Sequence, residues 1–145
     1  MPGTLIITRG LPASGKTTWA KEIQASGEKI IIVCRDDIRE MLHSSLFSQE
    51  NEKITNKVRD FSIREGLKAG RTVICAGTNI HLGVVDHLLK IARQHDALSY
   101  VEDKFLEVPF EVCIERDSKR PNPVGQSVII KMAQLLEVQN DTVHG

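Results

Sequence analysis

The sequence predicts a three-layer α/β domain with a small, mainly parallel sheet of about four strands and helices on both faces. Short apolar runs at residues 5–7, 30–34 and 72–75 are typical of strands that are buried on both faces. Stretches with apolar residues at helical spacing alternate with these runs, which is the order expected of a parallel sheet. The chain has 145 residues, of which 41% are hydrophobic. We therefore expect residues 1–145 to form one domain around a single core.

The first half of the chain contains two of the expected strands and three helices. A glycine-containing loop follows the first strand and leads into a helix over residues 17–23, which Gly27 ends. Asp36 follows the second strand at the position of a helix N-cap, ahead of a short helix. Ser48 can cap a longer helix that ends at Gly70. The inner face of this longer helix is expected to carry Ile54, Val58 and Phe61.

The second half repeats the alternation. The third strand precedes an amphipathic helix over residues 83–95, and a fourth strand is expected over residues 99–107. Pro109 suits the first turn of the next helix, because it lacks the N–H donor that would be unpaired there. Residues 119–125 are basic and rich in proline, which indicates a loop. The final helix carries apolar residues at helical spacing: Val128, Ile129, Met132, Leu135 and Leu136.

Composition excludes several classes of protein. Basic and acidic residues are equal in number, so the chain has no global positive field, and nucleic acid would have to bind through a local basic patch. Three widely spaced cysteines are too few for a disulfide framework or a zinc site, and we expect buried, reduced thiols. No apolar run approaches the roughly 20 residues of a membrane span, and the N-terminus lacks a signal peptide. We expect a cytoplasmic protein; its oligomeric state is not decided by the sequence.

Residues 10–17 carry the strongest functional signal. They read Gly-Leu-Pro-Ala-Ser-Gly-Lys-Thr and match the phosphate-loop pattern G-x-x-x-x-G-K-[ST] in full, between an expected strand and an expected helix. The glycines let successive N–H groups point at phosphate oxygens, and the helix N-terminus favours the same anion. Lys16 is expected to reach the β- and γ-phosphates, and the Thr17 hydroxyl to be a ligand of Mg²⁺. The residues expected to contact ATP here are Gly10, Pro12, Ala13, Ser14, Gly15, Lys16, Thr17 and Thr18.

An Arg-Asp-Asp-Ile-Arg block directly follows the second strand. Carboxylates at the carboxyl end of a strand face the crevice in which open α/β sheets bind ligands. Asp36 and Arg39 are three residues apart and so lie on one side of a helix. The pair could hold an acceptor hydroxyl and a neighbouring anionic group. The alternative is a helix cap with an exposed salt bridge.

Two further segments bear on the chemistry. The third strand ends in Ala-Gly-Thr-Asn, and many phosphate-loop enzymes carry an acid near this point that helps to hold Mg²⁺, where this chain has Gly77. Asn79 either caps the next helix or, with Thr78, lies at the substrate. Arg116, Lys119 and Arg120 precede the proline-rich loop and could close over the triphosphate as a lid. Alternatively, these basic residues interact only with the dipole of their helix.

In combination these segments resemble the kinase domain of phage polynucleotide 5′-kinases, nearly from end to end. The shared features are the loop with its following Trp19, the Arg-Asp-Asp-Ile-Arg block, the Thr78 and Asn79 pair, and the Ser-Lys-Arg sequence that ends at Arg120. The resemblance implies a P-loop NTPase fold of the adenylate-kinase-like type. It also implies transfer of the γ-phosphate of ATP to the 5′-hydroxyl of DNA or RNA, in nucleic-acid end repair. A phage-encoded member would act in the host cytoplasm.

The resemblance also assigns roles to individual residues. Asp36 is the implied general base, and Arg39 the implied ligand of the acceptor's 3′-phosphate. Lys16 and Arg120 would stabilise the transferring phosphoryl group. The remaining implied contacts are Thr17 with the metal, Arg35 and Thr78 with the acceptor, and Val124 with a nucleobase. Arg116 is expected at the nucleotide from its place before the lid loop, not from the resemblance.

The chain departs from the family at Gly77 and in its lid, which is one residue shorter. Gly77 stands where the family carries an aspartate, so ATP binding should survive while turnover is in doubt. Divergence, use of Asp37 in place of the missing acid, and loss of activity are the three explanations that the sequence leaves open. We find no D-x-D-x-T motif and expect no phosphatase domain. Two rival hypotheses remain: a kinase for a small metabolite or nucleoside, and a binding-only module that has lost catalysis through Gly77.

Overall fold

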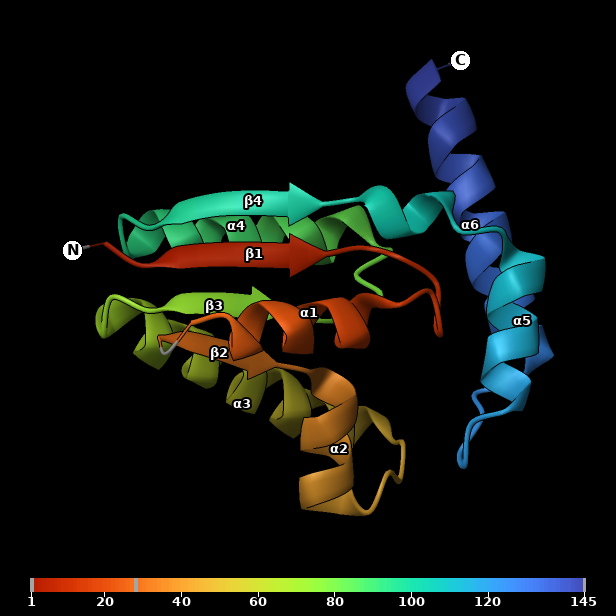
Figure 1. Cartoon of the computed structure of the whole chain (residues 1–145), viewed down its shortest axis with the longest axis horizontal. Helices are drawn as coiled ribbons and strands as arrows, with labels where there is room; N and C mark the ends of the chain where they lie inside the picture. The colour runs from red at the N-terminus through yellow and green to blue at the C-terminus, as the bar shows by residue number, and fades with distance from the viewer. Residues whose placement is uncertain (1, 28, 145) are drawn as a thin grey trace.

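A computed structural model of the chain describes residues 2–27 and 29–144, with side chains to residue 140 (Figure 1). Four strands alternate with six α-helices and one 3₁₀ helix among these residues. The elements are β1 (Thr4–Thr8), α1 (Lys16–Ala25), β2 (Ile30–Val33), α2 (Arg35–His43), α3 (Gln49–Lys68), β3 (Thr72–Cys75), α4 (Leu82–Gln94), β4 (Leu98–Glu102), η1 (Lys104–Glu107), α5 (Phe110–Ser118) and α6 (Gln126–His144).

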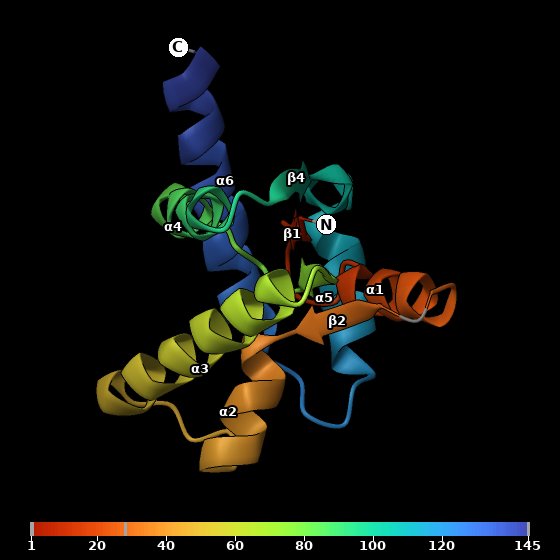
Figure 2. The same cartoon turned by 90° about the vertical axis from the view of Figure 1, so that its left-hand side faces the viewer.

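The four strands form one parallel sheet in the order β2-β3-β1-β4. Helix α1 lies on one face of the sheet, and α3 and α4 lie on the other (Figure 2). The prediction of a three-layer α/β domain with a parallel sheet of about four strands is therefore confirmed. Among the described residues, no helix is both long and apolar enough to cross a membrane.

Burial on both faces explains why the strand sequences are apolar without alternation. Leu5, Ile7 and Val73 are fully buried in the core cluster that the sheet forms with α3 and α4. Ile74 is equally buried but belongs to the cluster on the other face, where Ala20 of α1 covers it. Close packing of this kind makes truncation costly: large-to-alanine changes at such sites destabilise by about 2–5 kcal/mol.

The N-terminal half of α3 differs from its predicted register. Ser48 caps the helix as expected, since its hydroxyl accepts the N–H of Asn51 at 3.0 Å. The expected inner residues Ile54 and Phe61 are, however, 50% and 64% exposed. Thr55, Arg59, Ile63 and Leu67 are buried in their place. Polar side chains can lie inward here because the Thr55 hydroxyl bonds to the carbonyl of Asn51 at 2.9 Å and Arg59 pairs with Asp60 at 2.9 Å.

Strand β4 is shorter than predicted and ends at Glu102. The following residues turn into η1, because Phe105 packs inward against Trp19 of α1, with ring centroids 5.7 Å apart. The Lys104 ammonium lies 4.8 Å from the Trp19 ring. A Cβ on Gly10 would lie 2.6 Å from the Cβ of Phe105. The close packing of η1 therefore leaves no room for a side chain at the first residue of the phosphate loop.

All four strands end at the same edge of the sheet, where the loops to α1 and α2 begin (Figure 1). Helices α5 and α6 pack against each other beside that edge. Gln139 of α6 ties the pair to the sheet, because its amide donates to the Ile80 carbonyl at 2.9 Å and accepts from Arg9 at 3.3 Å. The phosphate loop (residues 10–17), the acidic block (residues 35–39) and the lid loop (residues 119–125) therefore all lie at this edge.

Candidate active site

The loop between β1 and α1 makes a left-handed turn at Gly15, as a glycine allows, and another at Ala13. Ala13 and Gly15 have φ of 63° and 106°, in the left-handed region, and Gly15 is the N-cap of α1. The Gly10 N–H donates to the Thr78 carbonyl at 3.1 Å, which joins the loop to the end of β3. Gly10, Pro12 and Ser14 are buried, and they are not among the residues that line the cavity beside the loop. Local sequence thus accounts for the turn itself.

Lys16 lies inside this loop rather than extending from it. Its ammonium donates to the carbonyls of Gly10 at 3.0 Å and Leu11 at 2.6 Å, and to the Ser14 hydroxyl at 3.2 Å. Burial lowers the pKa of Lys16 to about 8, because these partners are neutral and compensate the lost hydration only in part. The lysine is therefore a desolvated cation without a counter-anion of its own in direct contact.

A cavity of about 590 Å³ opens beside the loop. Thr17 and Thr18 line it at the N-terminus of α1, and Arg116 and Arg120 line it from α5 and the lid loop. The fold therefore brings the predicted lid arginines to the same space as the phosphate loop. The complete lining is Ala13, Gly15, Lys16, Thr17, Thr18, Trp19, Glu22, Arg116 and Arg120.

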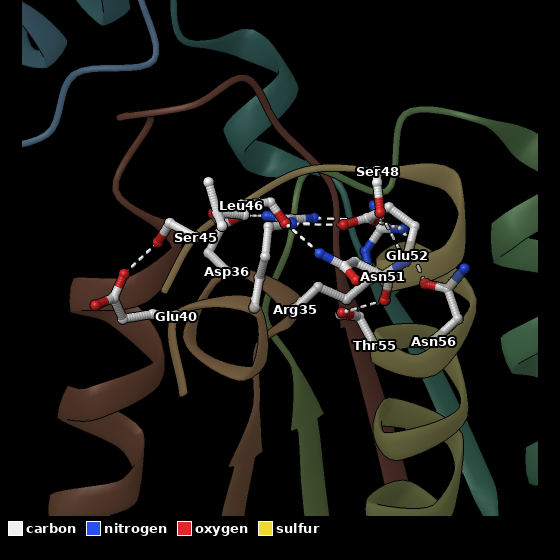
Figure 3. Close-up of polar contacts among 11 residues, drawn as sticks. Arg35, Asp36, Glu40, Ser45, Leu46, Ser48, Asn51, Glu52, Thr55 and Asn56 are labelled. Carbon is white, nitrogen blue, oxygen red and sulfur yellow. Dashed lines mark hydrogen bonds and ion pairs between the residues drawn. The ribbon is translucent and has the colours of Figure 1, made fainter. Parts of the chain in front are cut away.

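The acidic block forms a network with α3 (Figure 3). Arg39 donates through Nη1 to Asp36 at 2.7 Å, and through Nε and Nη2 to the two carboxylate oxygens of Glu52 at 2.5 and 3.0 Å. Arg35 donates to the Asn56 amide oxygen at 3.1 Å. Hydrogen bonds to Glu52 raise the pKa of Arg39, and the same bonds lower the pKa of Glu52. The guanidinium of Arg39 is thus fixed by two carboxylates.

Asp36 is the most exposed member of this network, with 76% of its side chain accessible. The expected capping role is wrong, because α2 begins at Arg35 with Cys34 as N-cap, and no side chain caps it. Asp36 also lies near enough to Lys16 for its charge to raise the pKa of the lysine against the larger effect of burial. Asp36 thus pairs with Arg39 at 2.7 Å, but it is not among the residues that line the cavity beside the phosphate loop.

At the end of β3, Thr8 holds the backbone of Gly77 and the side chain of Asn79. The Thr8 hydroxyl donates to the Gly77 carbonyl at 3.0 Å and lies 3.1 Å from the Gly77 N–H. The atoms nearest to a Cβ at Gly77 belong to Asn79, at 3.4 Å or more, so a Cβ fits there. Asn79 is buried and donates to the Thr8 carbonyl at 2.9 Å, while His81 is the N-cap of α4; the capping alternative for Asn79 is wrong. Thr78 is half-buried and holds Gly10 through its carbonyl.

The lid loop is organised by Asp117, a residue that sequence reasoning did not select. Its carboxylate accepts the N–H groups of Val124 and Gly125 at 3.0 Å each and pairs with Arg120 at 3.3 Å. The side chain of Val124 is exposed and available to a ligand. Glu52 and Asn56 were missed for the same reason as Asp117. The partners of Glu52 and Asn56 lie on another helix, and those of Asp117 lie in a loop that folds back on it. No sequence motif has a spacing that identifies such residues.

Magnesium would have to be held by few protein atoms. The described residues contain no group of three or more His, Cys, Asp or Glu side chains that could hold a metal ion. Thr17 is exposed and lines the cavity, and Glu22 is the carboxylate among the lining residues. This donor set fits Mg²⁺, which keeps several waters and is commonly bound through one or two protein oxygens and substrate phosphates.

Known proteins similar to this chain include several kinases. Residues 5–141 match the family AAA_33, described as an AAA domain. A protein of Autographa californica nuclear polyhedrosis virus, provisionally named a bifunctional polynucleotide kinase/RNA ligase, is 26% identical across 94% of this chain and 21% of its own length. The L-seryl-tRNA(Sec) kinase of Methanococcus maripaludis is 30% identical across 88% of this chain and 50% of its own length.

Solved structures give the same picture. A chain of the Pnkp1/Rnl/Hen1 RNA repair complex superposes with a TM-score of 0.83 at 27% identity, over 97% of this chain and 46% of that one. The Mycobacterium tuberculosis APS kinase CysC, in complex with AMPPNP and APS, superposes at 0.65 with 14% identity, which shows a shared fold alone. The chain spans half or less of the two relatives and of the repair-complex chain.

Proposed function

The chain belongs to the AAA_33 family and is a P-loop kinase domain, and we propose that it transfers the γ-phosphate of ATP to the 5′-hydroxyl end of DNA or RNA. The polynucleotide kinase/RNA ligase relative and the RNA repair complex support this acceptor. We further propose that the reaction belongs to nucleic-acid end repair. Because the chain spans only part of these relatives, their other activities are not part of the proposal.

The observation that carries the proposal is the position of Asp36. It lies 2.7 Å from Arg39 and close enough to Lys16 to influence its pKa. A general base for phosphoryl transfer must reach the acceptor hydroxyl while the phosphoryl group is held in line. Asp36 has 76% of its side chain exposed and so can meet an acceptor, whereas Glu52 is mostly covered and holds Arg39. We assign Asp36 as the base and Glu52 as the residue that orients Arg39.

The reaction then needs only the residues already described. Asp36 accepts the proton of the 5′-hydroxyl as its oxygen bonds to the γ-phosphorus, and the bond to the β-phosphate oxygen breaks to release ADP. Lys16 and Arg120 neutralise the charge on the transferring group. Thr17 would hold Mg²⁺, which would supply further charge neutralisation.

Arg39 is proposed to bind the 3′-phosphate of the acceptor nucleotide by exchanging partners. Glu52 holds its Nε and Nη2, while Nη1 points at Asp36. A phosphate that takes over Nη1 releases Asp36 to accept the hydroxyl proton, without freeing the arginine from Glu52. Arg35 and Thr78 are proposed as lesser contacts to the acceptor, and Val124 as a contact to its base. This exchange favours phosphorylated nucleotides over bare nucleosides.

A kinase for another acceptor is the second candidate. The resemblance to the L-seryl-tRNA(Sec) kinase supports it, with 30% identity over 88% of this chain against 26% over 94% for the viral relative. Both candidates share the donor site and differ only in what enters beside Arg39. A phosphate-bearing acceptor suits the arginine in either case. The acceptor therefore has to be identified by experiment.

The test is transfer from γ-labelled ATP and Mg²⁺ to a panel of acceptors. The panel contains a 5′-hydroxyl oligonucleotide, a nucleoside 3′-phosphate, the matching nucleoside, seryl-tRNA and APS, with Lys16→Ala as the inactive control. We expect label on the oligonucleotide and the nucleoside 3′-phosphate, and little on the nucleoside. Label on seryl-tRNA or APS alone contradicts the proposal. ATP binding without any transfer favours the binding-only alternative.

A further inference from the structure

Asp117 is a buried carboxylate in the last turn of α5, and only 3% of its side chain is exposed. One oxygen accepts the N–H of Val124 at 3.0 Å and lies 3.3 Å from the Arg120 guanidinium. The other accepts the N–H of Gly125 at 3.0 Å. Burying a carboxylate is costly unless it is paired. Here every one of these three partners belongs to the lid loop at residues 119–125.

The lid loop has few other means of holding its shape. Pro121 and Pro123 lack N–H donors. Gly125 has a φ of 98°, a conformation that side chains disfavour, and it turns its N–H toward Asp117. Asp117 therefore closes the loop, because its fixed carboxylate accepts hydrogen bonds from backbone N–H groups of the loop.

The same carboxylate reaches the phosphate cavity through Arg120. Arg120 lines that cavity, and its charge lowers the pKa of Lys16, so both cations face a common space. Its contact with Asp117 restricts a side chain that is otherwise 44% exposed and long enough to sample many rotamers. An arginine that is aimed in advance loses less freedom when the phosphate arrives.

We propose that Asp117 is a positioning residue that holds the lid loop and aims Arg120 at the transferring phosphoryl group before ATP binds. The inference rests on the proposed kinase reaction for its kinetic readout, while its effect on the loop can be measured without any acceptor. Asp117 itself does not touch the substrate. Its influence passes through Arg120.

The chain offers a matched control within the same helix. Glu115 pairs with Lys119 at 3.5 Å, four residues along, just as Asp117 pairs with Arg120 three residues along. Both members of the Glu115 pair are more than 70% exposed, and Glu115 makes no contact with the loop amides of Val124 and Gly125. Exposed pairs of this kind contribute little. Glu115→Gln therefore removes a comparable charge without disturbing the lid.

The kinetic test compares Asp117→Asn with Glu115→Gln, Arg120→Ala and the double variant Asp117→Asn/Arg120→Ala. Asparagine keeps the size of the side chain but replaces one acceptor by a donor and removes the charge. We expect kcat to fall about 10–100-fold in Asp117→Asn, as misplacement of a reacting group does, and to stay within twofold in Glu115→Gln. The double variant should be no slower than Arg120→Ala alone, because Asp117 acts through Arg120.

A second measurement is independent of activity. Trypsin cleaves after Lys119, whereas Pro121 protects the bond after Arg120. We expect this cleavage to be several-fold faster in Asp117→Asn than in the wild type, and unchanged in Glu115→Gln. If Asp117→Asn does not fold, Gly125→Ala replaces it, since the added Cβ meets nothing within 4 Å but disfavours the φ of 98°. Unchanged kcat and cleavage, or full additivity with Arg120→Ala, overturns the proposal. If Asp117→Asn is cleaved faster but the wild-type protein labels no acceptor, the role of Asp117 in the lid stands and the proposed function is wrong.

Discussion

Lys16 on the donor side and Arg39 on the acceptor side both bind groups of the protein's own chain, but the groups differ. Lys16 rests on two carbonyls and a hydroxyl, which are neutral, and burial lowers its pKa to about 8. Arg39 is held by the carboxylates of Glu52 and Asp36, which raise its pKa. A phosphate thus finds an uncompensated cation on one side and a compensated one on the other.

The difference implies two modes of binding. On the donor side, the triphosphate supplies the counter-charge that Lys16 lacks, so binding relieves a desolvation cost. On the acceptor side, a phosphate has to exchange with Asp36, and Glu52 keeps the arginine in place during the exchange. The donor site is therefore ready before ligand arrives, and the acceptor site is completed by its ligand.

Lys16→Ala tests the donor half and carries the largest expected effect. Loss of the ammonium removes the fixed cation at the β- and γ-phosphates, and kcat/KM for ATP should fall about a thousandfold or more. Lys21→Ala is the control, because Lys21 lies on the same helix with an exposed side chain. Near-normal turnover of Lys16→Ala, measured by label transfer, removes the donor-site assignment.

Glu52→Gln tests the acceptor half. Glutamine can accept only one of the two bonds that Glu52 takes from Arg39, so the arginine loses its orientation. We expect kcat/KM for a 3′-phosphorylated acceptor to fall about 10–100-fold, with the KM for ATP unchanged. Glu40→Gln is the control, since Glu40 is exposed on α2 and bonds to Ser45 instead. An equal loss for ATP and acceptor contradicts the separation of the two halves.

The donor half could be predicted from the sequence because its residues are consecutive. The spacing of residues 10–17 fixes the turn, the glycines and the position of Lys16 on the following helix. Asp36 and Arg39 were also identifiable, since three residues along one helix set their mutual position. The hydrogen-bonded layer around them was not, because Glu52 comes from a different helix and Asp117 binds a loop that folds back on it.

The same distinction explains the errors in the fold. Periodicity placed Ile54 and Phe61 of α3 inside, but the structure buries Thr55 and Arg59 and exposes the apolar pair. Hydropathy does not reveal that Arg59 has a paired carboxylate in Asp60 and can therefore be buried. The fourth strand was overextended because its apolar pattern continues to Phe105, which turns instead toward Trp19.

The pH dependence of ATP affinity sharpens the comparison. Lys16 binds phosphate in its protonated form, so affinity is full below a pH of about 8 and falls as the pH rises through that value. The loss should approach tenfold per pH unit above it. Between about 8 and the ordinary value of 10.5, the unfolded chain binds the extra proton, so ligand-free stability rises with pH.

The single tryptophan, Trp19, lines the cavity and gives a fluorescence signal for this titration. Lys16→Gln is the control and should show a flat profile over the same range. A wild-type affinity that is constant from pH 7 to 9.5 contradicts the account of Lys16. Arg39 remains charged throughout, so acceptor affinity should not follow the same curve.

Gly77→Asp has the smallest expected effect. The added Cβ meets Asn79 at 3.4 Å, an ordinary contact, and the backbone φ at this position is not in the left-handed region, so the variant should fold. A carboxylate at the end of β3 would add a second acid for the metal, and we expect a several-fold rise in kcat. The measurement is steady-state transfer over a range of Mg²⁺ concentrations. If kcat falls although the variant folds, the mechanism does not need an acid at this position.

Asp36→Asn in a single-turnover transfer from labelled ATP to a 5′-hydroxyl oligonucleotide tests most directly the claim that both halves of the site meet at this carboxylate. The control is Asp37→Asn, because Asp37 is the adjacent exposed carboxylate but lines a separate cavity of about 240 Å³ beside β2. We predict a rate lower by about 10²–10⁴ in Asp36→Asn, with ATP affinity by Trp19 fluorescence unchanged, and a normal rate in Asp37→Asn. A rate within twofold of the wild type in Asp36→Asn would contradict the account.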